Sequence, residues 1–178
     1  MELQPALEKR RIIFIDETGV NLSLTCAYGR ARRGKRAVGA VPKNYGKSLS
    51  LIGAMSREGI IGSFCFLGST DTAAMRVFLR EVLLPVLKPG DLVVWDNLTV
   101  HKTRAVLSEF EKAEVEVLFL PPYSPDLNPI EMCWSKVKTY LKQVAARNYA
   151  ALNEAISAAL LTVTIADVAN WMRHCGYI

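Results

Sequence analysis

The segment "LVVWDNLTVHK", residues 92–102, places an acidic side chain directly after a run of apolar residues. Leu92–Trp95 has the composition of an interior β-strand, and Asp96 follows it at once. A carboxylate is costly to bury unless a charge or a hydrogen-bond donor compensates it. The segment therefore predicts a buried strand that leads into an acidic residue whose partner must come from elsewhere.

The composition is that of a folded globular chain. Its 178 residues suit one domain with a substantial core, and 51% hydrophobic against 22% charged residues excludes a disordered chain. The formal net charge of +5 is mild, but the basic residues are unevenly distributed.

Cysteine spacing and hydropathy indicate the compartment. The four cysteines lie far apart without a CxxC pair, which favours reduced thiols over a zinc site or a disulfide framework. Residues 1–11 lack the basic-then-apolar order of a signal peptide. The apolar stretch 150–171 is interrupted by polar residues too often for a membrane span. We therefore expect a cytoplasmic protein with no membrane partner.

Periodicity and turn residues divide the chain into strands and helices. An apolar strand in "RRIIFIDETG", residues 10–19, also ends in acidic residues, Asp16 and Glu17. The expected order is this strand, a hairpin (48–56 and 59–68), a helix (69–87), a strand (91–97), a helix (103–113), a strand (115–122), a helix (128–145) and two more helical segments. This order predicts an α/β fold, a mixed sheet flanked by helices whose crossovers join parallel strands.

The two strand-end aspartates predict a shared site. If their strands are neighbours, Asp16 and Asp96 emerge at one edge of the sheet, where such folds place ligands. Two carboxylates about 4 Å apart repel by roughly 4 kcal/mol at an effective dielectric near 20. They must share a proton or hold a cation, and magnesium or manganese suits a site made of carboxylates.

Each acidic residue also has a plain structural interpretation. Asp96 could cap the turn that follows its strand, and Glu17 could replace Asp16 as a ligand. Glu131 is either a third ligand or part of a capping box, with Asn128 as N-cap and Pro129 as the first helical residue. The prolines within residues 121–129 stiffen the approach to Glu131 under both interpretations.

Three segments resemble a known family. "FIDETG", "WDNLTVHK" and "LPPYSPDLNPIEMCWSKVK" closely resemble the catalytic domain of mariner-like DDE transposases, and the bacterial insertion-sequence branch (family six-thirty) matches best. That family carries an Asp, Asp, Glu pattern with thirty-four residues commonly separating the last two. Thirty-four residues also separate Asp96 from Glu131.

The resemblance implies a fold, a site and an activity. It implies one ribonuclease H-like catalytic domain over residues 1–178, in which Asp16, Asp96 and Glu131 bind two Mg²⁺ or Mn²⁺ ions. The implied activity is that of an endonuclease and strand transferase in cut-and-paste DNA transposition. The implied partners are the element ends, target DNA and a second copy of the chain on paired ends, in a bacterial cytoplasm at the nucleoid.

One feature departs from the family pattern. Full-length relatives carry helix-turn-helix DNA-binding modules before the catalytic domain, and only fifteen residues precede Asp16. A separate or frameshift-fused N-terminal half would then recognise the element ends. The alternative is an inactive or truncated remnant that only binds DNA or a partner.

A basic segment and a histidine complete the candidate residues. Arg30, Arg32, Arg33, Lys35 and Arg36 put five cations into seven positions. The segment is either a solvated charged loop or an arm that contacts DNA phosphates. Asn97 and His101 are accessory candidates, since His101 could assist substrate placement or proton transfer, or be an ordinary turn residue.

Overall fold

The computed structural model describes residues 10–178, apart from the side chains of Thr99 and Val100. The expectation about a signal peptide falls mainly on residues 1–9, outside the described residues. The described chain forms a five-stranded mixed sheet in the order β3-β2-β1-β4-β5. The strands are β1 (Ile12–Val20), β2 (Leu49–Ser56), β3 (Gly59–Leu67), β4 (Leu92–Trp95) and β5 (Glu116–Phe119). The predicted mixed sheet and its hairpin are thus confirmed.

The central strand β1 joins the two halves of the sheet. It runs antiparallel to β2 and parallel to β4, and β4 runs parallel to β5. The pair Phe14↔Val94 sets the register, so that Asp16 and Asp96 each lie two residues beyond it. The predicted neighbourhood of the two acidic strands is therefore confirmed.

Asp16, however, lies within its strand and not at its end. Antiparallel pairing with β2 continues from Asp16↔Gly53 to Val20↔Leu49, whereas β4 stops at Trp95. The apolar run 12–15 of β1 ends level with the end of β4, its parallel neighbour. The sequence pattern therefore predicted the end of β1 too early.

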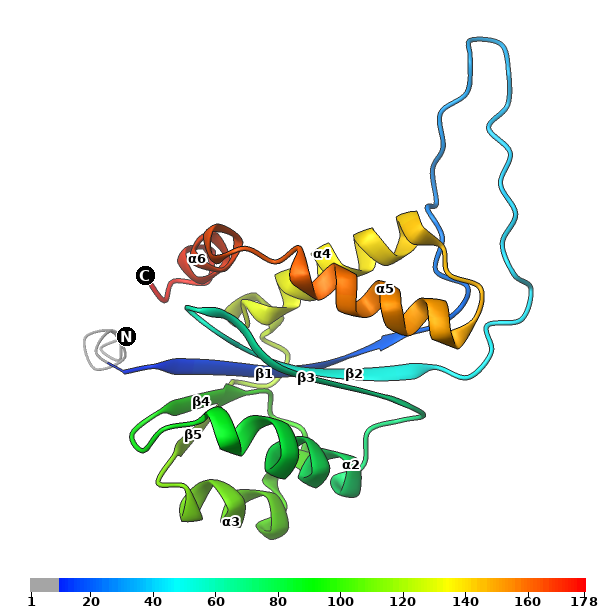
Figure 1. Ribbon diagram of the computed structural model, residues 1–178. Coiled ribbons are helices and arrows are strands. Elements are labelled where there is room, and N and C mark those ends of the chain that lie inside the picture. The colour runs from blue at the N-terminus through cyan, green and yellow to red at the C-terminus, as the bar shows by residue number, and fades with distance from the viewer. Residues whose placement is uncertain (1–9) are drawn as a thin grey trace.

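Helices cover both faces of the sheet (Figure 1). On one side lie α4 (Ile130–Val144), α5 (Tyr149–Leu161) and α6 (Ile165–His174), and α6 begins with the capping box of Thr164 and Asp167. On the other lie α3 (Arg104–Lys112) and α2 (Thr72–Val77), which Asp71 caps. The helical run from α2 continues through a π-helical segment, Phe78–Leu83, and a 3₁₀ turn, Leu84–Val86. Further 3₁₀ turns cover Thr99–Lys102 and Pro125–Leu127.

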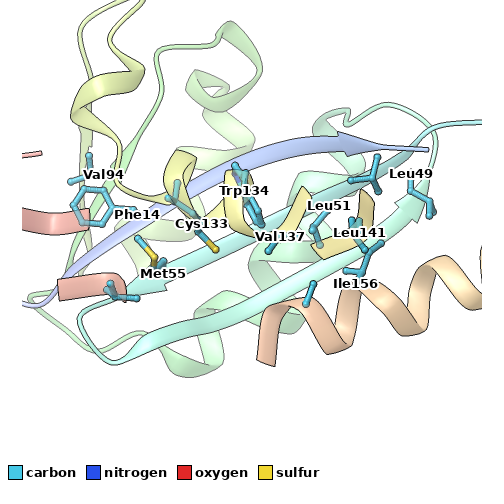
Figure 2. Packing of buried hydrophobic residues seen from close by; sticks show 14 of the residues in the cluster. Phe14, Leu49, Leu51, Met55, Val94, Cys133, Trp134, Val137, Leu141 and Ile156 are labelled. Carbon is cyan, nitrogen blue, oxygen red and sulfur yellow. The ribbon is translucent and has the colours of Figure 1, made fainter. Parts of the chain in front are cut away.

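Strand alternation divides the core into two layers. Phe14, Leu51 and Val94 pack against α4, whereas Ile13, Ile15 and their neighbours pack against α2 and α3. Figure 2 shows the first layer, in which the side chains of α4 lie over β1 and β2. Within the described residues, no single helix is long and apolar enough to cross a membrane; α5 and α6 meet that test only as a pair bent by 76°.

Residues 21–48 form a long excursion between β1 and β2, which we call the arm. Figure 1 shows it projecting away from the body, and its side chains from Cys26 to Val41 are exposed. Both ends of the arm are held where α4 leads into α5. Arg147 donates to the carbonyls of Leu22 (3.0 Å) and Leu24 (3.1 Å), and the Tyr149 hydroxyl bonds the backbone of Lys47. The base of the arm is therefore fixed to the helical layer.

Helix α4 approaches the sheet closely at one glycine. A Cβ added to Gly53 of β2 would lie 2.4 Å from the ring carbon Cη2 of Trp134, far inside van der Waals contact. Figure 2 shows Trp134 on the face of α4 that meets the sheet. The absence of a side chain at Gly53 thus makes room for the indole.

We expect Gly53→Ala to destabilise the protein by about 1–3 kcal/mol, because the added methyl would push Trp134 and α4 away from the sheet. The measurement is the free energy of unfolding in urea. Gly19→Ala is the matched control, since Gly19 lies in β1 with nothing within 4 Å of its added Cβ. Equal stabilities for the two variants would contradict this account of the packing.

Candidate active site

Three acidic side chains from separate elements line one pocket. Asp16 comes from β1, Asp96 follows β4 and Glu131 belongs to the first turn of α4. The pocket has a volume of about 360 Å³, and its remaining lining is Asn97, Leu98, residues 120–125 and Asn128. It opens beyond the carboxyl end of β4, the edge at which α/β sheets bind ligands.

Asp16 is the buried member of this group, with 7% of its surface exposed. Its Oδ2 accepts a hydrogen bond of 2.8 Å from the indole Nε1 of Trp134. Burial, and next the charge of Glu131, raise the pKa of Asp16 to about 7, with Asp96 adding to the rise. Hydrogen bonds from the Glu17 backbone and from Trp134 oppose the shift without cancelling it. The site therefore holds a carboxyl group that ionises only near neutral pH.

Asp96 is half-buried and contacts a histidine. The Nδ1 atom of His101 lies 2.5 Å from Oδ1 of Asp96, a charge contact whose atoms are not aligned as in a well-directed hydrogen bond. The backbone N–H of Leu98 donates to the same Oδ1 over 3.5 Å. Because that bond is long, turn capping describes Asp96 only weakly, and the ion pair is its principal contact.

His101 is a buried bridge between two carboxylates. Only 1% of its surface is exposed, and its ring stacks on Trp95 with centroids 3.9 Å apart and planes 16° apart. Its Nε2 lies 2.9 Å from Oε1 of Glu17. Burial lowers the pKa of His101, but the contacts with Asp96 and Glu17 outweigh it and raise the pKa to about 9. His101 is thus a cation at neutral pH, held between two carboxylates on the 3₁₀ turn Thr99–Lys102, and its accessory role stays a prediction.

The position of Glu17 does not support its role as a rival ligand. Successive strand residues face opposite sides of a sheet, so Glu17 points away from Asp16 and Trp134. Its carboxylate is paired with His101, and it does not line the pocket of Asp16.

Glu131 has an exposed side chain on the pocket wall. The capping-box interpretation is wrong, because the helix starts at Ile130, Pro129 occupies the N-cap position and no side chain caps it. Asn128 is buried at 3% exposure, and its Oδ1 has no hydrogen-bond partner among the described residues. The side chain of Glu131 is therefore not held in a capping interaction and faces the pocket.

The donor set suits a hard divalent cation. Three carboxylates line one pocket, and part of the raised pKa of Asp16 comes from the negative charges of Glu131 and Asp96, which a cation would offset. In the part of the chain that is described, no three His, Cys, Asp or Glu side chains are grouped closely enough to hold an ion. The residues fit such an ion by the chemistry of their oxygen ligands, although their side chains are too far apart to hold one in this arrangement, and Glu131 is the exposed member of the three.

The basic residues lie apart from these acids. All five are exposed on the arm, and none of them lines the pocket. They are Arg30, Arg32, Arg33, Lys35 and Arg36. A backbone hydrogen bond of 2.9 Å from Lys35 N–H to the Arg32 carbonyl closes a turn among them. The structure thus separates a cationic arm from an anionic pocket.

Sequence reasoning missed two residues of this site. Trp134 reads as a core residue, although its place three positions after Glu131 puts both on one helix face and could have suggested a role beside the acids. Tyr123 lies on the pocket rim, but the sequence interpretation treated its segment only as a rigid loop and gave Tyr123 no role.

Residues 11–153 match the DDE superfamily endonuclease family. This chain belongs to that family. It is 34% identical over 141 residues to the transposable element Tcb1 transposase of Caenorhabditis briggsae, a match covering 75% of this chain and 52% of that protein. It is 38% identical over 99 residues to the Tcb2 transposase of the same organism. This match covers 47% of this chain and 36% of Tcb2. The chain therefore spans about half of the length of Tcb1 transposase and a smaller part of Tcb2 transposase.

Solved structures of Mos1 transposase share the fold. The catalytic domain of Mos1 mariner transposase superposes with a TM-score of 0.64 at 18% identity, covering 93% of this chain and 77% of that one. The Mos1 transposase paired-end complex with left transposon end has a TM-score of 0.70 at 20% identity. This match covers 93% of this chain and 52% of the Mos1 chain. The predicted ribonuclease H-like fold of this DDE family member is thereby confirmed.

We expect Asp16→Asn to stabilise the protein by about 1–3 kcal/mol at pH 8 in a chelating buffer, because it removes a buried negative charge. The folded-state pKa of Asp16, about 7, lies above the ordinary value of 3.8 for an aspartate. The folded protein therefore loses stability as the pH rises between these values, and the difference between variant and wild type should grow from pH 4 to pH 7 and then level off. Urea unfolding across this range measures it.

The matched control for this experiment is Asp126→Asn, which changes an exposed aspartate on the neighbouring 3₁₀ turn. It should show no such growth with pH. A constant difference between Asp16→Asn and wild type at all pH values would contradict the raised pKa.

Proposed function

We propose that this chain is the catalytic part of a DNA transposase that cleaves DNA and transfers the cut strand. Asp16, Asp96 and Glu131 are its proposed catalytic residues. The observation that carries the proposal is that these acids, from three elements distant in sequence, line one pocket in a chain of the DDE family.

The proposed cofactor is a pair of Mg²⁺ or Mn²⁺ ions held by the three acids. When bound, such ions activate the attacking oxygen and stabilise the leaving oxygen of an in-line displacement at phosphorus. Crystal structures of the Mos1 mariner paired-end complex with Mn and with Mg support this choice of ion.

The surrounding side chains orient the acids for that role. Trp134 fixes one oxygen of Asp16 by its 2.8 Å bond, and His101 fixes one oxygen of Asp96. Stacking on Trp95 and the contact with Glu17 hold the His101 ring in turn. Two aspartates held by neighbouring side chains, beside Glu131 on the pocket wall, suit a preorganised site.

The proposed reaction has two displacements of the same geometry. Water first attacks the phosphodiester and frees a 3′-hydroxyl at the element end. That hydroxyl then attacks a phosphodiester of the target DNA. Because both steps exchange one oxygen for another at phosphorus, one set of acids serves both.

The arm is proposed to contact DNA phosphates through Arg30, Arg32, Arg33, Lys35 and Arg36. Its exposure and its anchored base support this role, because an arm tied at both ends loses less freedom on binding than a free chain end. The Mos1 complexes contain paired ends and a left transposon end, which supports a homodimer on paired element ends here.

Origin and partners belong to the same proposal. The best-resembled branch suggests a bacterial insertion-sequence element and action in the cytoplasm at the nucleoid. Since the chain spans 52% of Tcb1 transposase, a separate or frameshift-fused N-terminal half is the proposed source of end recognition.

A second function is favoured by one observation. No three acids in the described chain are grouped closely enough for an ion, which is what an inactive remnant that only binds DNA or a partner would show. Ion binding and cleavage distinguish the two functions.

We expect the purified chain to nick a labelled DNA duplex with Mg²⁺ or Mn²⁺, and Asp96→Ala to reduce the rate at least about a hundredfold while remaining folded. Mn²⁺ should also raise the Tm of the wild type but not of Asp96→Ala. Ca²⁺ should raise the Tm yet support little cleavage. A rise in Tm without nicking would show that cleavage requires the proposed N-terminal half as well, and neither effect would establish the remnant.

We expect Arg32→Gln with Arg33→Gln to weaken duplex binding and to reduce the slope of log K against log salt by about 1.8, at roughly 0.9 per lost phosphate contact. Fluorescence anisotropy over a salt series measures this slope. The control is Arg173→Gln, an exposed arginine near the end of α6. An unchanged slope in the double variant would make the arm a solvated loop.

A further inference from the structure

Tyr123 lies on the rim of the acidic pocket with an exposed side chain and an unfavourable backbone conformation. Its side chain is fully exposed although it lines the pocket with Asp16, Asp96 and Glu131. Its φ of 57° lies in the left-handed region, which bulky residues rarely adopt and which concentrates at functional sites. Nothing in the packing of the core requires an aromatic ring at this position.

The chain on both sides of Tyr123 is stiff. Pro121, Pro122 and Pro125 fix three backbone angles around it, and the hydroxyl of Ser124 donates to the Pro122 carbonyl over 3.4 Å. Before these residues, the N–H of Leu120 bonds the Trp95 carbonyl at 2.8 Å, which ties the segment to β4. The backbone that carries the ring is therefore held in place on the wall of the pocket that Asp16, Asp96 and Glu131 also line.

The wall around Tyr123 is apolar. Residues 120–125 contain no cationic side chain, and Leu98, a second exposed hydrophobic residue, lines the same pocket. A phosphate is bound most strongly by cationic side chains, and residues 120–125 offer none. The face of a nucleobase is flat and apolar, and aromatic and aliphatic side chains are what it stacks on.

We propose that Tyr123 is a stacking platform for an unpaired nucleobase next to the phosphodiester in the pocket. This inference rests on the proposed function, because it requires DNA as the substrate. Stacking accepts any base, since every base has a π-face, so the platform would hold a frayed DNA end without reading its sequence. Base pairs at a cut end open at little cost, which makes such a base available.

The test compares two DNA probes in a chelating buffer, in which no cleavage occurs. One is a blunt duplex, and the other is the same duplex with a single unpaired 2-aminopurine at its end, whose fluorescence is quenched by stacking. Anisotropy gives the affinity for each probe, and quenching at saturation reports stacking. Wild type and Tyr123→Phe should quench the probe equally, because both keep the ring.

Tyr123→Ala should abolish the quenching and weaken binding of the tailed probe by about tenfold, with a smaller loss for the blunt duplex, whose end must open before a base can stack. Tyr123→Gly should do the same while leaving the Tm unchanged or higher, since glycine suits the left-handed backbone. Tyr45→Ala is the control, because it removes an exposed tyrosine from the arm and should keep the preference for the tailed probe.

Other outcomes overturn the inference in distinguishable ways. Quenching by Tyr123→Ala equal to wild type would show that the base stacks elsewhere or not at all. Loss of quenching in Tyr123→Phe would assign the contact to the phenol hydroxyl and not to the ring. Failure of the wild type to bind either probe would overturn the proposed function as well, and a fall in Tm of Tyr123→Gly would make the residue structural.

Discussion

The buried carboxyl of Asp16 is the constraint on which the site depends. It lies in the central strand, paired with β2 on one side and following the parallel register with β4 on the other, so it cannot move without disturbing the sheet. The indole of Trp134 gives it a hydrogen bond, and Gly53 gives the indole its room. Helix α4 is therefore seated on the sheet at the point where it also presents Glu131 to the pocket. The packing of α4 on the sheet thus also determines where two of the acidic side chains of the pocket lie.

The charges around this carboxyl are divided between the two faces of the sheet. Facing α4, Asp16 is close enough to Glu131 and Asp96 for their charges to raise its pKa to about 7. On the opposite face, His101 offsets the charges of Glu17 and Asp96 and is fixed on Trp95. The histidine thus supplies positive charge to one aspartate but leaves the pocket acidic. Such an arrangement lowers the stability of the protein alone, and a cation that binds the pocket would recover it.

Local patterns in the sequence were enough to predict the parts that depend on neighbouring residues. The strand before Asp96, the hairpin and α4 follow from periodicity and turn chemistry, and the helical crossover between β3 and β4 agrees with the expected mixed sheet. Long-range pairing was not predictable in the same way. β1 extends past Asp16 only because β2 continues beside it, and His101 reaches Glu17 across 84 positions. The uncapped start of α4 also departs from its sequence signature, since Asn128 is buried beside the pocket instead of capping the helix.

Helix α4 connects the anionic pocket to the cationic arm. Glu131 lies in its first turn, and Arg147 and Tyr149, which hold the arm, follow its last turn. The fifteen residues of α4 span roughly 22 Å at 1.5 Å per residue, about two-thirds of a turn of duplex DNA. Among its exposed residues, Ser135, Thr139 and Lys142 are spaced along one helix face. Hydroxyl and amino groups are phosphate donors, so a duplex held by the arm would meet such donors along this face on its way to the pocket.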